Sequence, residues 1–268
     1  IDIGQGANTI IAQMAAEELD VPIEQIEVVD VVSTQTNPYD WNTVASKYTF
    51  MGGNAIVKAC RDMVRQLKEV AGQILRSTPE NLRHGGGYIY HVHNPERRVS
   101  YQSMSLGYAY WDGMGIGGPM IAHGSSIADG LTNLHPETGQ GNPALDWTFG
   151  AHAVELEVDV ETGDITVLKV ASAFDVGQVI NEKLVYGQIT GGVVQGLGSA
   201  ILEGYKFNAE NKLMNPSFTD NKIPTMKDMP LEIVPIYIEN PQHDGPFGAR
   251  GVGEHPMISI PSAIVETA

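Results

Sequence analysis

Apolar side chains recur at helical spacing in two long segments of the sequence. Over residues 50–76 they keep to one helical face, which predicts a long amphipathic helix. Residues 182–202 form a second helical segment behind Asn181, a residue type that commonly caps helices. Shorter helices are predicted from Asn8 or Thr9 through Leu19, and from near Met257 onward. The apolar face of the first long helix consists of Ile56, Cys60, Met63, Leu67, Ala71 and Ile74.

The second long helix is unusually rich in glycine. Each glycine in a helix interior costs about 0.5–1 kcal/mol relative to alanine. We therefore expect its backbone to lie close against another element or a ligand. The glycines are Gly187, Gly191, Gly192, Gly196 and Gly198.

Alternating and β-branched segments predict the strands. Residues 25–32 have this character, and so do residues 151–159 and 165–173, which flank the turn residues 161–164 as in a hairpin. Residues 231–238 predict another strand, in which Pro235 favours an edge position or a bulge. The elements together predict an α+β fold with two lobes, each a small mixed sheet that carries one long helix.

We expect the first lobe to cover residues 1–150 and the second to cover residues 151–268, with the cofactor cleft between them. Residues 85–150 form a variable, glycine-rich insertion in the first lobe. The sequence starts without methionine and ends inside a helical pattern, which is typical of a piece of a longer protein or subunit.

Composition narrows the function classes. The 268 residues are 42% hydrophobic and carry a formal net charge of −16, so nucleic-acid backbones and anionic membrane surfaces are unfavourable partners. No apolar run approaches the roughly 18 residues that a membrane span needs. The single cysteine, Cys60, excludes an internal disulfide or an iron–sulfur cluster held by this chain, and favours a reducing, cytoplasmic location. Because Cys60 lies on the apolar helix face, we expect it to be buried.

Two apparent motifs are rejected. The glycines of residues 113–118 match a dinucleotide-binding fingerprint in form, but Pro119 follows at once and no helix pattern opens. His84, His91 and His93 have no acidic or cysteine partner at metal-ligand spacing, so exposed hairpin histidines are the better interpretation.

Two polar residues framed by glycines are the candidates for chemistry. Gln5 lies in Gly4-Gln5-Gly6, and Glu254 follows Gly253. Glycine allows a bound group to approach closely. Each residue alone has an ordinary explanation, since Gln5 fits a turn and a glutamate near a helix start complements the helix dipole. Gln188, inside the glycine-rich helix, could equally face solvent.

The motifs in series are more specific than any one of them. They resemble, in order and over nearly the whole chain, the xanthine dehydrogenase / aldehyde oxidoreductase family of molybdenum hydroxylases, in the C-terminal part of the molybdopterin-binding region of the large subunit. The matching segments are Gly4-Gln5-Gly6 with Thr9, residues 43–49, residues 52–55, Asp175-Val176-Gly177, Gly187-Gln188, residues 194–198 and residues 248–254.

The resemblance implies roles for individual residues. Glu254 would be the base that takes a proton from the water-derived ligand of molybdenum, and Gln5 would hydrogen-bond the apical oxo group. Backbone amides of residues 45–49 and the Gln188 side chain would hold the pterin and its phosphate. The metal would be held by the pterin dithiolene near Gln5 and Glu254, without a direct protein ligand. The implied cofactor-binding set is Gly4, Gln5, Gly6, Thr43, Ala45, Ser46, Lys47, Tyr48, Thr49, Gln188 and Gly253.

The resemblance also implies cofactors and partners. The cofactor is molybdopterin with molybdenum, in the plain or the cytosine dinucleotide form. An upstream molybdopterin-binding portion, an iron–sulfur subunit or domain, and a flavin component in some members would complete the enzyme. The implied reaction is hydroxylation of an aldehyde or an N-heteroaromatic carbon with oxygen from water. We expect Glu254 to lie in a dry, glycine-lined site.

Three departures leave alternatives open. Lys47 stands where the family often has arginine, and His255 where many members have proline. The start of the chain and residues 245–249 also resemble the hydroxybenzoyl-CoA reductase branch, which removes a hydroxyl group. A non-catalytic truncated fragment is the remaining alternative, since loops of the metal site normally lie upstream.

Overall fold

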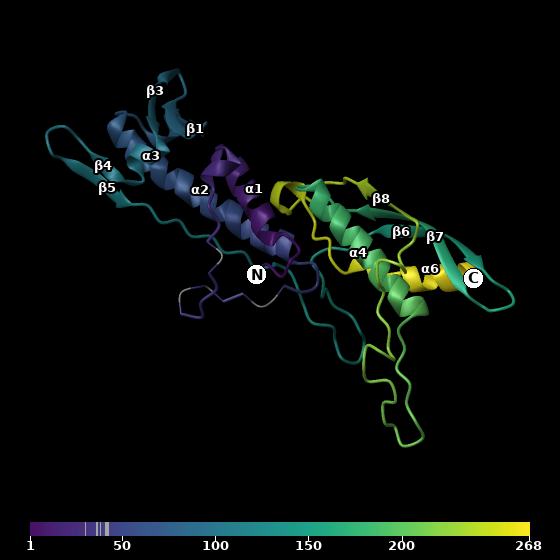
Figure 1. The fold of residues 1–268 in the computed structure, drawn as a ribbon. Helices are drawn as coiled ribbons and strands as arrows, with labels where there is room; N and C mark the ends of the chain where they lie inside the picture. The colour runs from purple at the N-terminus through teal and green to yellow at the C-terminus, as the bar shows by residue number, and fades with distance from the viewer. Residues whose placement is uncertain (30, 36, 38, 41–42) are drawn as a thin grey trace. The chain divides into compact units, whose positions relative to one another are not determined.

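The computed structural model describes residues 1–29, 31–35, 37, 39–40 and 43–268 (Figure 1). The described chain divides into two compact units. The first unit contains Ile1–Thr43 and Lys47–Asp129, and the second contains Val44–Ser46 and Gly130–Ala268. The predicted domain boundary at residue 150 stays a prediction.

The first unit is built on the long predicted helix. Helix α2 (Tyr48–Ile74) contacts α1 (Ala7–Leu19), which is followed by the short η1 (Ile23–Gln25). Both helices occur where the apolar spacing predicts them. Cys60 is buried on the apolar face of α2, and burial raises the pKa of its thiol to about 11. The thiol is therefore protonated at neutral pH.

Short strands cover the C-terminal half of α2. Leu67 and Ala71 of the helix form a buried core with Leu82, Ile89 and Met104. The strands pair in an antiparallel sheet of order β1-β2-β3 and a separate antiparallel pair, β4-β5, so the mixed sheet predicted for this lobe is wrong. The elements are η2 (Pro79–Asn81), β1 (Leu82–Gly85), β2 (Tyr88–His91), β3 (Asn94–Ser100), α3 (Tyr101–Met104), β4 (Leu106–Ala109) and β5 (Gly115–Pro119).

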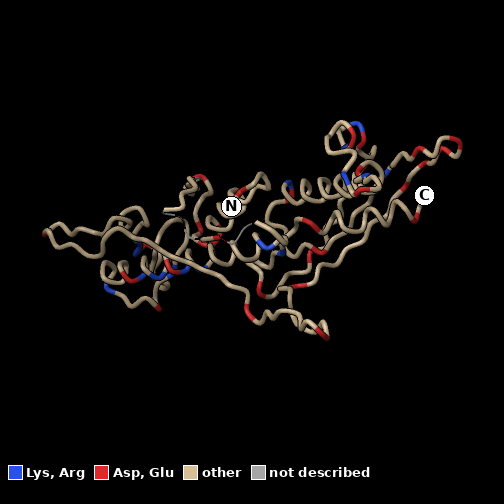
Figure 2. The backbone as a smooth tube through the Cα atoms, turned by 90° about the horizontal axis from the view of Figure 1, so that it is seen from below, with Lys and Arg blue, Asp and Glu red and all other residues tan. Residues whose placement is uncertain are grey.

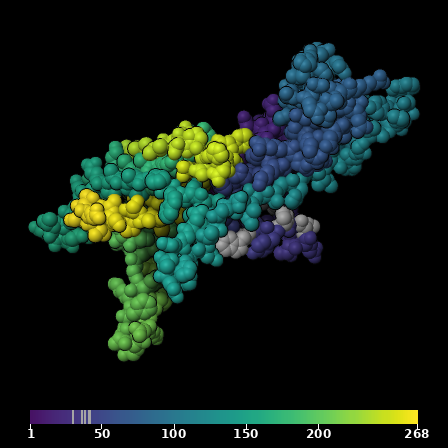
Figure 3. All heavy atoms as spheres, turned by 180° about the vertical axis from the view of Figure 1, so that it is seen from behind, coloured from purple at the N-terminus to yellow at the C-terminus, as the bar shows by residue number. Residues whose placement is uncertain are grey.

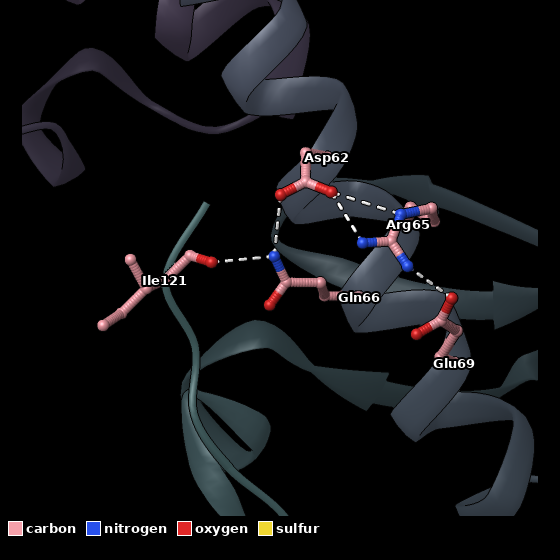
Figure 4. A network of polar contacts seen from close by, with 5 residues as sticks. All are labelled: Asp62, Arg65, Gln66, Glu69 and Ile121. Carbon is pink, nitrogen blue, oxygen red and sulfur yellow. Dashed lines mark hydrogen bonds and ion pairs between the residues drawn. The ribbon is translucent and has the colours of Figure 1, made fainter. Parts of the chain in front are cut away.

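A polar network on α2 holds the segment that follows β5. Arg65 bridges Asp62 at 2.7 Å and Glu69 at 2.6 Å, while Gln66 donates to Asp62 and to the carbonyl of Ile121, at 2.9 Å and 2.8 Å (Figure 4). Exposed ion pairs of this kind contribute only about 0–1 kcal/mol each. Their effect is to orient Gln66, whose amide fixes the backbone at Ile121 beside the helix.

The predicted strand over residues 25–32 is wrong for the residues that the structure describes. Residues 23–25 form η1, and residues 26–29 and 31–32 belong to no strand. The side chains of Val29, Val31 and Val32 are exposed. β-branched residues favour extended backbone, but a strand also needs a neighbour to pair with.

The second unit contains a mixed sheet of order β6-β7-β8. Strand β6 (Gly150–Val158) and strand β7 (Ile165–Asp175) form the predicted hairpin, and β8 (Glu232–Ile238) pairs parallel to β7. β8 lies at the sheet edge, as Pro235 predicts. Helix α4 (Glu182–Ile201) belongs to the connection between β7 and β8, and the Asn181 side chain accepts from the Leu184 amide at 3.1 Å, as a cap does.

One face of this sheet carries the core. Val167 and Val170 of β7 pack with Val193 and Leu197 of α4 and with Ile260 of α6 (Ile260–Thr267). The short η3 (Pro246–Gly248) and α5 (His255–Ile258) precede α6. The predicted terminal helix is thus two short helices in succession.

Four of the five glycines of α4 divide into two groups, and the fifth, Gly198, lies against Glu203 and Pro224. A Cβ on Gly192 would lie 2.7 Å from Pro256 Cβ, and one on Gly196 would lie 2.7 Å from Ile260 Cβ, so these positions allow α5 and α6 to approach. A Cβ on Gly187 or Gly191 would meet no described atom within 4 Å. The expected close packing explains the first group and leaves the second group open.

Between α4 and β8 the chain makes a long excursion with little regular structure. A bridge pairs Phe207 with Leu213, and the buried Asn215 accepts from the Lys206 amide at 2.8 Å. The excursion is the green segment that projects from the second unit in Figure 3. Acidic residues are spread along the backbone of both units (Figure 2). Among the described residues, no helix combines the length and apolarity needed to cross a bilayer.

The two glycine groups predict opposite effects of alanine. Gly196→Ala should lower the free energy of unfolding by about 1–3 kcal/mol, because its Cβ overpacks against Ile260. Gly191→Ala should raise it by about 0.5–1 kcal/mol through helix propensity. Urea unfolding of the two variants measures both values. Equal effects in the two variants would contradict this packing.

Candidate functional site

Two distant segments meet at Ser46 in the second unit. Ala45 and Ser46 adopt left-handed φ values of 54° and 53°, and the Glu254 amide donates to Ser46 Oγ at 3.1 Å. A Cβ on Gly251 would collide with the Ser46 carbonyl, and one on Gly253 would lie 2.9 Å from Ser46 Oγ. Gly251 is therefore required by contact with the Ser46 backbone, and Gly253 leaves room for the Ser46 side chain.

Helix α4 lies against the same segment. Val252 packs in a cluster with Val185 and Ile189, on either side of Gln188 in the sequence. The Gln188 side chain is half-buried and forms no hydrogen bond with a described residue. A polar amide of this kind, near the open backbone at Gly187 and Gly191, leaves donors and an acceptor for a ligand.

The residue before the glycines, Arg250, is held by several partners. Its guanidinium Nη1 donates to the Trp147 carbonyl at 3.0 Å and lies 3.7 Å from Asp146 Oδ2, while Nη2 lies 3.6 Å from Asp175 Oδ2. The Arg250 side chain is 11% exposed. Sequence reasoning assigned no role to Arg250 or Asp175, although both lie in the motifs that carry the family resemblance. The sequence did contain a signal for Arg250, because an arginine within the glycine-rich motif of residues 248–254 is unusual in a chain of net charge −16.

An aromatic cluster lies directly beyond Glu254. The Phe174 ring lies between His152 and His255, with centroid distances of 5.1 Å and 5.3 Å. His152 also contacts Ser172 Oγ through Nδ1 at 2.8 Å. Burial lowers the pKa of His255 to about 4 and lowers the pKa of His152 as well. His255 is therefore neutral at neutral pH and places no second charge beside Glu254.

Gln5 lies in the first unit, in the turn that begins α1. Its amide oxygen accepts from the Ile3 amide at 2.7 Å, and its Nε2 donates to the Ile1 carbonyl at 3.2 Å. Gly4 and Gly6 adopt left-handed φ values of 104° and 84°, so the turn requires glycine at both positions. An amide nitrogen carries two hydrogens, so Nε2 keeps one for another acceptor.

The cap of α1 differs from the prediction. Gly6 is the N-cap residue, in place of Asn8 or Thr9, and the Asp2 carboxylate accepts from the Asn8 amide at 2.9 Å. Backbone hydrogen bonds, with that from Asn8 first, lower the pKa of Asp2. A carboxylate at the helix start replaces the predicted side-chain cap.

The N-terminus of α2 also belongs to the first unit. Lys47 is the N-cap, Tyr48 and Thr49 form the first turn, and Lys47 makes no side-chain cap hydrogen bond to the described residues. The first turn has no acidic residue. Thr43 Oγ1 donates to the Ile1 carbonyl at 2.8 Å. The first amides of an α-helix have no acceptor within the helix, and together with the positive dipole end they make such a helix start suitable for an anion.

A family model described as the molybdopterin cofactor-binding domain matches residues 1–230. The chain belongs to this family. The resemblance to the large subunit of xanthine dehydrogenase and aldehyde oxidoreductase proteins is thereby confirmed.

Curated members of the molybdopterin-binding family are similar over almost the whole chain. The nicotine 6-hydroxylase large subunit of Paenarthrobacter nicotinovorans is 32% identical over 98% of this chain and 30% of the relative. The xanthine dehydrogenase molybdenum-binding subunit of Escherichia coli O157:H7 is 31% identical over 98% of this chain and 33% of the relative. The chain thus spans about a third of the length of the curated relatives it matches.

Solved structures agree with the fold. Quinoline 2-oxidoreductase from Pseudomonas putida 86 matches with a TM-score of 0.75 and 27% identity, over 99% of this chain and 32% of that chain. A Cu,Mo-CO dehydrogenase matches with a TM-score of 0.82 over the same shares of the two chains, and at 23% identity it supports the fold alone. The α+β class is confirmed by these likenesses.

The described residues fit a molybdopterin cofactor. The start of α2 offers backbone amides to a phosphate, and Gln188 offers an unengaged amide beside open helix backbone. The second unit brings Ser46, Gly253 and Glu254 into contact, whereas Gln5, Thr43 and residues 47–49 belong to the first unit. The roles of all these residues in the molybdopterin-binding family stay predictions here.

The dry site expected around Glu254 in the complete enzyme stays a prediction. Within the described chain, the Glu254 side chain is exposed. Glycines without side chains line its backbone, and the packing of residues 251–253 against Ser46 and α4 orders the backbone without covering the side chain. The described contacts therefore fix the backbone at Glu254.

The half-buried His255 predicts a pH dependence of stability. Below pH 6.5 an unfolded histidine takes up a proton that folded His255 resists until about pH 4. The free energy of unfolding should therefore fall between pH 6.5 and pH 4, and His255→Gln should reduce this fall. Urea unfolding at pH 7.5 and pH 5 measures it. His152→Gln should act in the same direction, and an unchanged pH dependence in both variants would refute the burial argument.

Proposed function

We propose that this chain is the molybdopterin-binding part of an oxidoreductase that hydroxylates an aldehyde or an N-heteroaromatic carbon with oxygen from water. The contact of Ser46 with Gly251, Gly253 and the Glu254 amide carries the proposal. It joins two of the motifs on which the family resemblance rests. Relatives named for nicotine and for xanthine support an N-heteroaromatic substrate. A relative named aldehyde oxidoreductase supports the aldehyde alternative.

The chain's own groups would hold the cofactor mainly through neutral donors. Amides of residues 45–49 would bind the phosphate, with the Lys47 side chain nearby in sequence, and Gln188 would bind the pterin. Backbone amides bind a dianion without adding cations to a chain of net charge −16. The bound molybdenum cofactor, in its plain or cytosine dinucleotide form, would supply the two-electron oxidation and the water-derived oxygen.

Two side chains would act at the reacting centre. The Glu254 carboxylate would accept a proton, and its backbone is fixed by the hydrogen bond to Ser46 Oγ. The remaining Nε2 hydrogen of Gln5 would donate to an oxygen of the cofactor. A positioned base contributes about 10²–10⁴-fold to a rate, whereas the loss of one hydrogen bond among several costs less.

The same proposal requires partners. Each oxidation releases two electrons, and the one cysteine of this chain is buried in α2, so another domain or subunit must hold iron–sulfur clusters. A relative named as a subunit of a dehydrogenase complex supports a multi-subunit assembly. An upstream molybdopterin-binding portion would cover Glu254, and a flavin component would complete some assemblies.

Replacement of the base tests the proposed reaction. In the complete enzyme, Glu254→Gln should keep molybdenum and pterin but lower turnover by about 10²-fold or more, because the amide cannot accept the proton. Gln5→Ala should have a smaller effect. Turnover per molybdenum is measured with aldehydes, purines and nicotinate and a dye acceptor.

Matched measurements make the result specific. Glu157→Gln replaces an exposed glutamate of β6 and should retain full turnover. Full turnover of Glu254→Gln would remove this residue from the mechanism. A complete complex without molybdenum and pterin would support the non-catalytic alternative, and dehydroxylation of hydroxybenzoyl-CoA would support the reductase alternative.

Metal analysis tests the partner requirement. The purified complete enzyme should contain iron and acid-labile sulfide, because this chain cannot supply four cysteine ligands to a cluster. The assay is elemental analysis together with the visible absorption of iron–sulfur clusters. An active enzyme free of iron would refute the requirement.

A further inference from the structure

Arg250 ties three segments of the second unit to the chain just before Glu254. Its backbone amide donates to the Val176 carbonyl at 3.2 Å. Its guanidinium reaches the Trp147 carbonyl, and the carboxylates of Asp146 and Asp175, at 3.0 Å, 3.7 Å and 3.6 Å. The Arg250 side chain therefore joins the segment before β6, at Asp146 and Trp147, to the C-terminal end of β7, at Asp175.

The buried carboxylate of Asp175 explains why an arginine stands at position 250. Its carboxylate is almost fully buried and also accepts from the Gly177 amide at 3.1 Å and from Asn240 Nδ2 at 3.3 Å. A Cβ on Gly177 would lie 2.8 Å from the Arg250 amide, so the two backbones are in direct contact. A buried carboxylate needs a matched cation, and the fork of an arginine can serve several acceptors in fixed directions.

The segment from Arg250 to Glu254 is thus fixed at both ends. Arg250 holds the start, and Ser46 Oγ holds the Glu254 amide at the end. The residues between are Gly251, Val252 and Gly253, two of which have no side chain to resist movement. A loss of either anchor would let the Glu254 backbone shift.

We infer that Arg250 is a positioning residue for Glu254, an inference that rests on the proposed function for its effect on turnover. The guanidinium would set where the base stands, without touching substrate or cofactor. Misplacement of a catalytic group by about 1 Å can cost about 10²-fold in rate. A residue that only neutralised Asp175 would change the amount of folded protein and leave the turnover of each loaded site unchanged.

The test uses Arg250→Lys in the complete enzyme. Lysine keeps the charge but loses the fork, so turnover per bound molybdenum should fall about tenfold or more with little change in KM. In a Glu254→Gln background the same substitution should add little, because both act through one group. Arg65→Lys, in the exposed network of α2, is the matched control and should retain turnover.

A second readout does not need the cofactor. Hydrogen exchange of the peptide covering residues 251–258 should be about tenfold faster in cofactor-free Arg250→Lys, while exchange in β7 stays at the wild-type rate. If Arg250→Lys folds poorly, Asp146→Asn removes one partner of the guanidinium and should shift both readouts in the same direction, by less. Wild-type exchange of residues 251–258 in both variants would overturn the inference.

The outcomes separate the two proposals. Full turnover of Glu254→Gln refutes the base, and with it the route by which Arg250 would affect turnover, while the exchange result still decides whether Arg250 holds the segment. A severe loss in Glu254→Gln with wild-type turnover per molybdenum in Arg250→Lys refutes the positioning role alone. Equal losses from Arg250→Lys with and without Glu254 also refute it, since the effect would then be independent of the base.

Discussion

Close contact between two backbones at Ser46 is the constraint on which the candidate site depends. The Glu254 amide reaches Ser46 Oγ across 208 positions of sequence, and side chains at Gly251 or Gly253 would block that approach. Closing so long a connection costs conformational entropy. Burial of apolar surface around Val252 and α4 offsets it, so the glycines and the hydrophobic cluster have to be considered together.

The glycines of helix α4 form two different surfaces. Gly192 and Gly196 admit α5 and α6, whereas Gly187 and Gly191 leave helix backbone open beside Gln188. The cost in helix propensity is thus distributed between packing and a surface that can accept a ligand. Such a division explains how a helix with so many glycines remains stable, because α5 and α6 support the half that carries the core.

The acidic charge of the chain is compatible with an anion site, because the candidate anion-binding groups are neutral. The chain has a net charge of −16, yet its candidate phosphate contacts are backbone amides at the start of α2, and Arg250 is directed toward the buried carboxylate of Asp175 and the half-buried carboxylate of Asp146. Neutral donors bind an anion through local dipoles, so the acidic surface and the anion site do not conflict. His255 is neutral at neutral pH, so it adds no positive charge beside Glu254.

The sequence by itself determined the long helices, the β6–β7 hairpin, the edge position of Pro235 and the family, because period and turn chemistry are local and the motifs occur in series. The tertiary structure decided the features that depend on contacts between residues far apart in the sequence. Among the described residues, 26–29 and 31–32 pair with no strand, so their β character produces no sheet. Arg250 meets Asp146 and Asp175 only through folding, and the Glu254 amide meets Ser46 Oγ in the same way. These features arise from long-range contacts, which local residue preference does not encode.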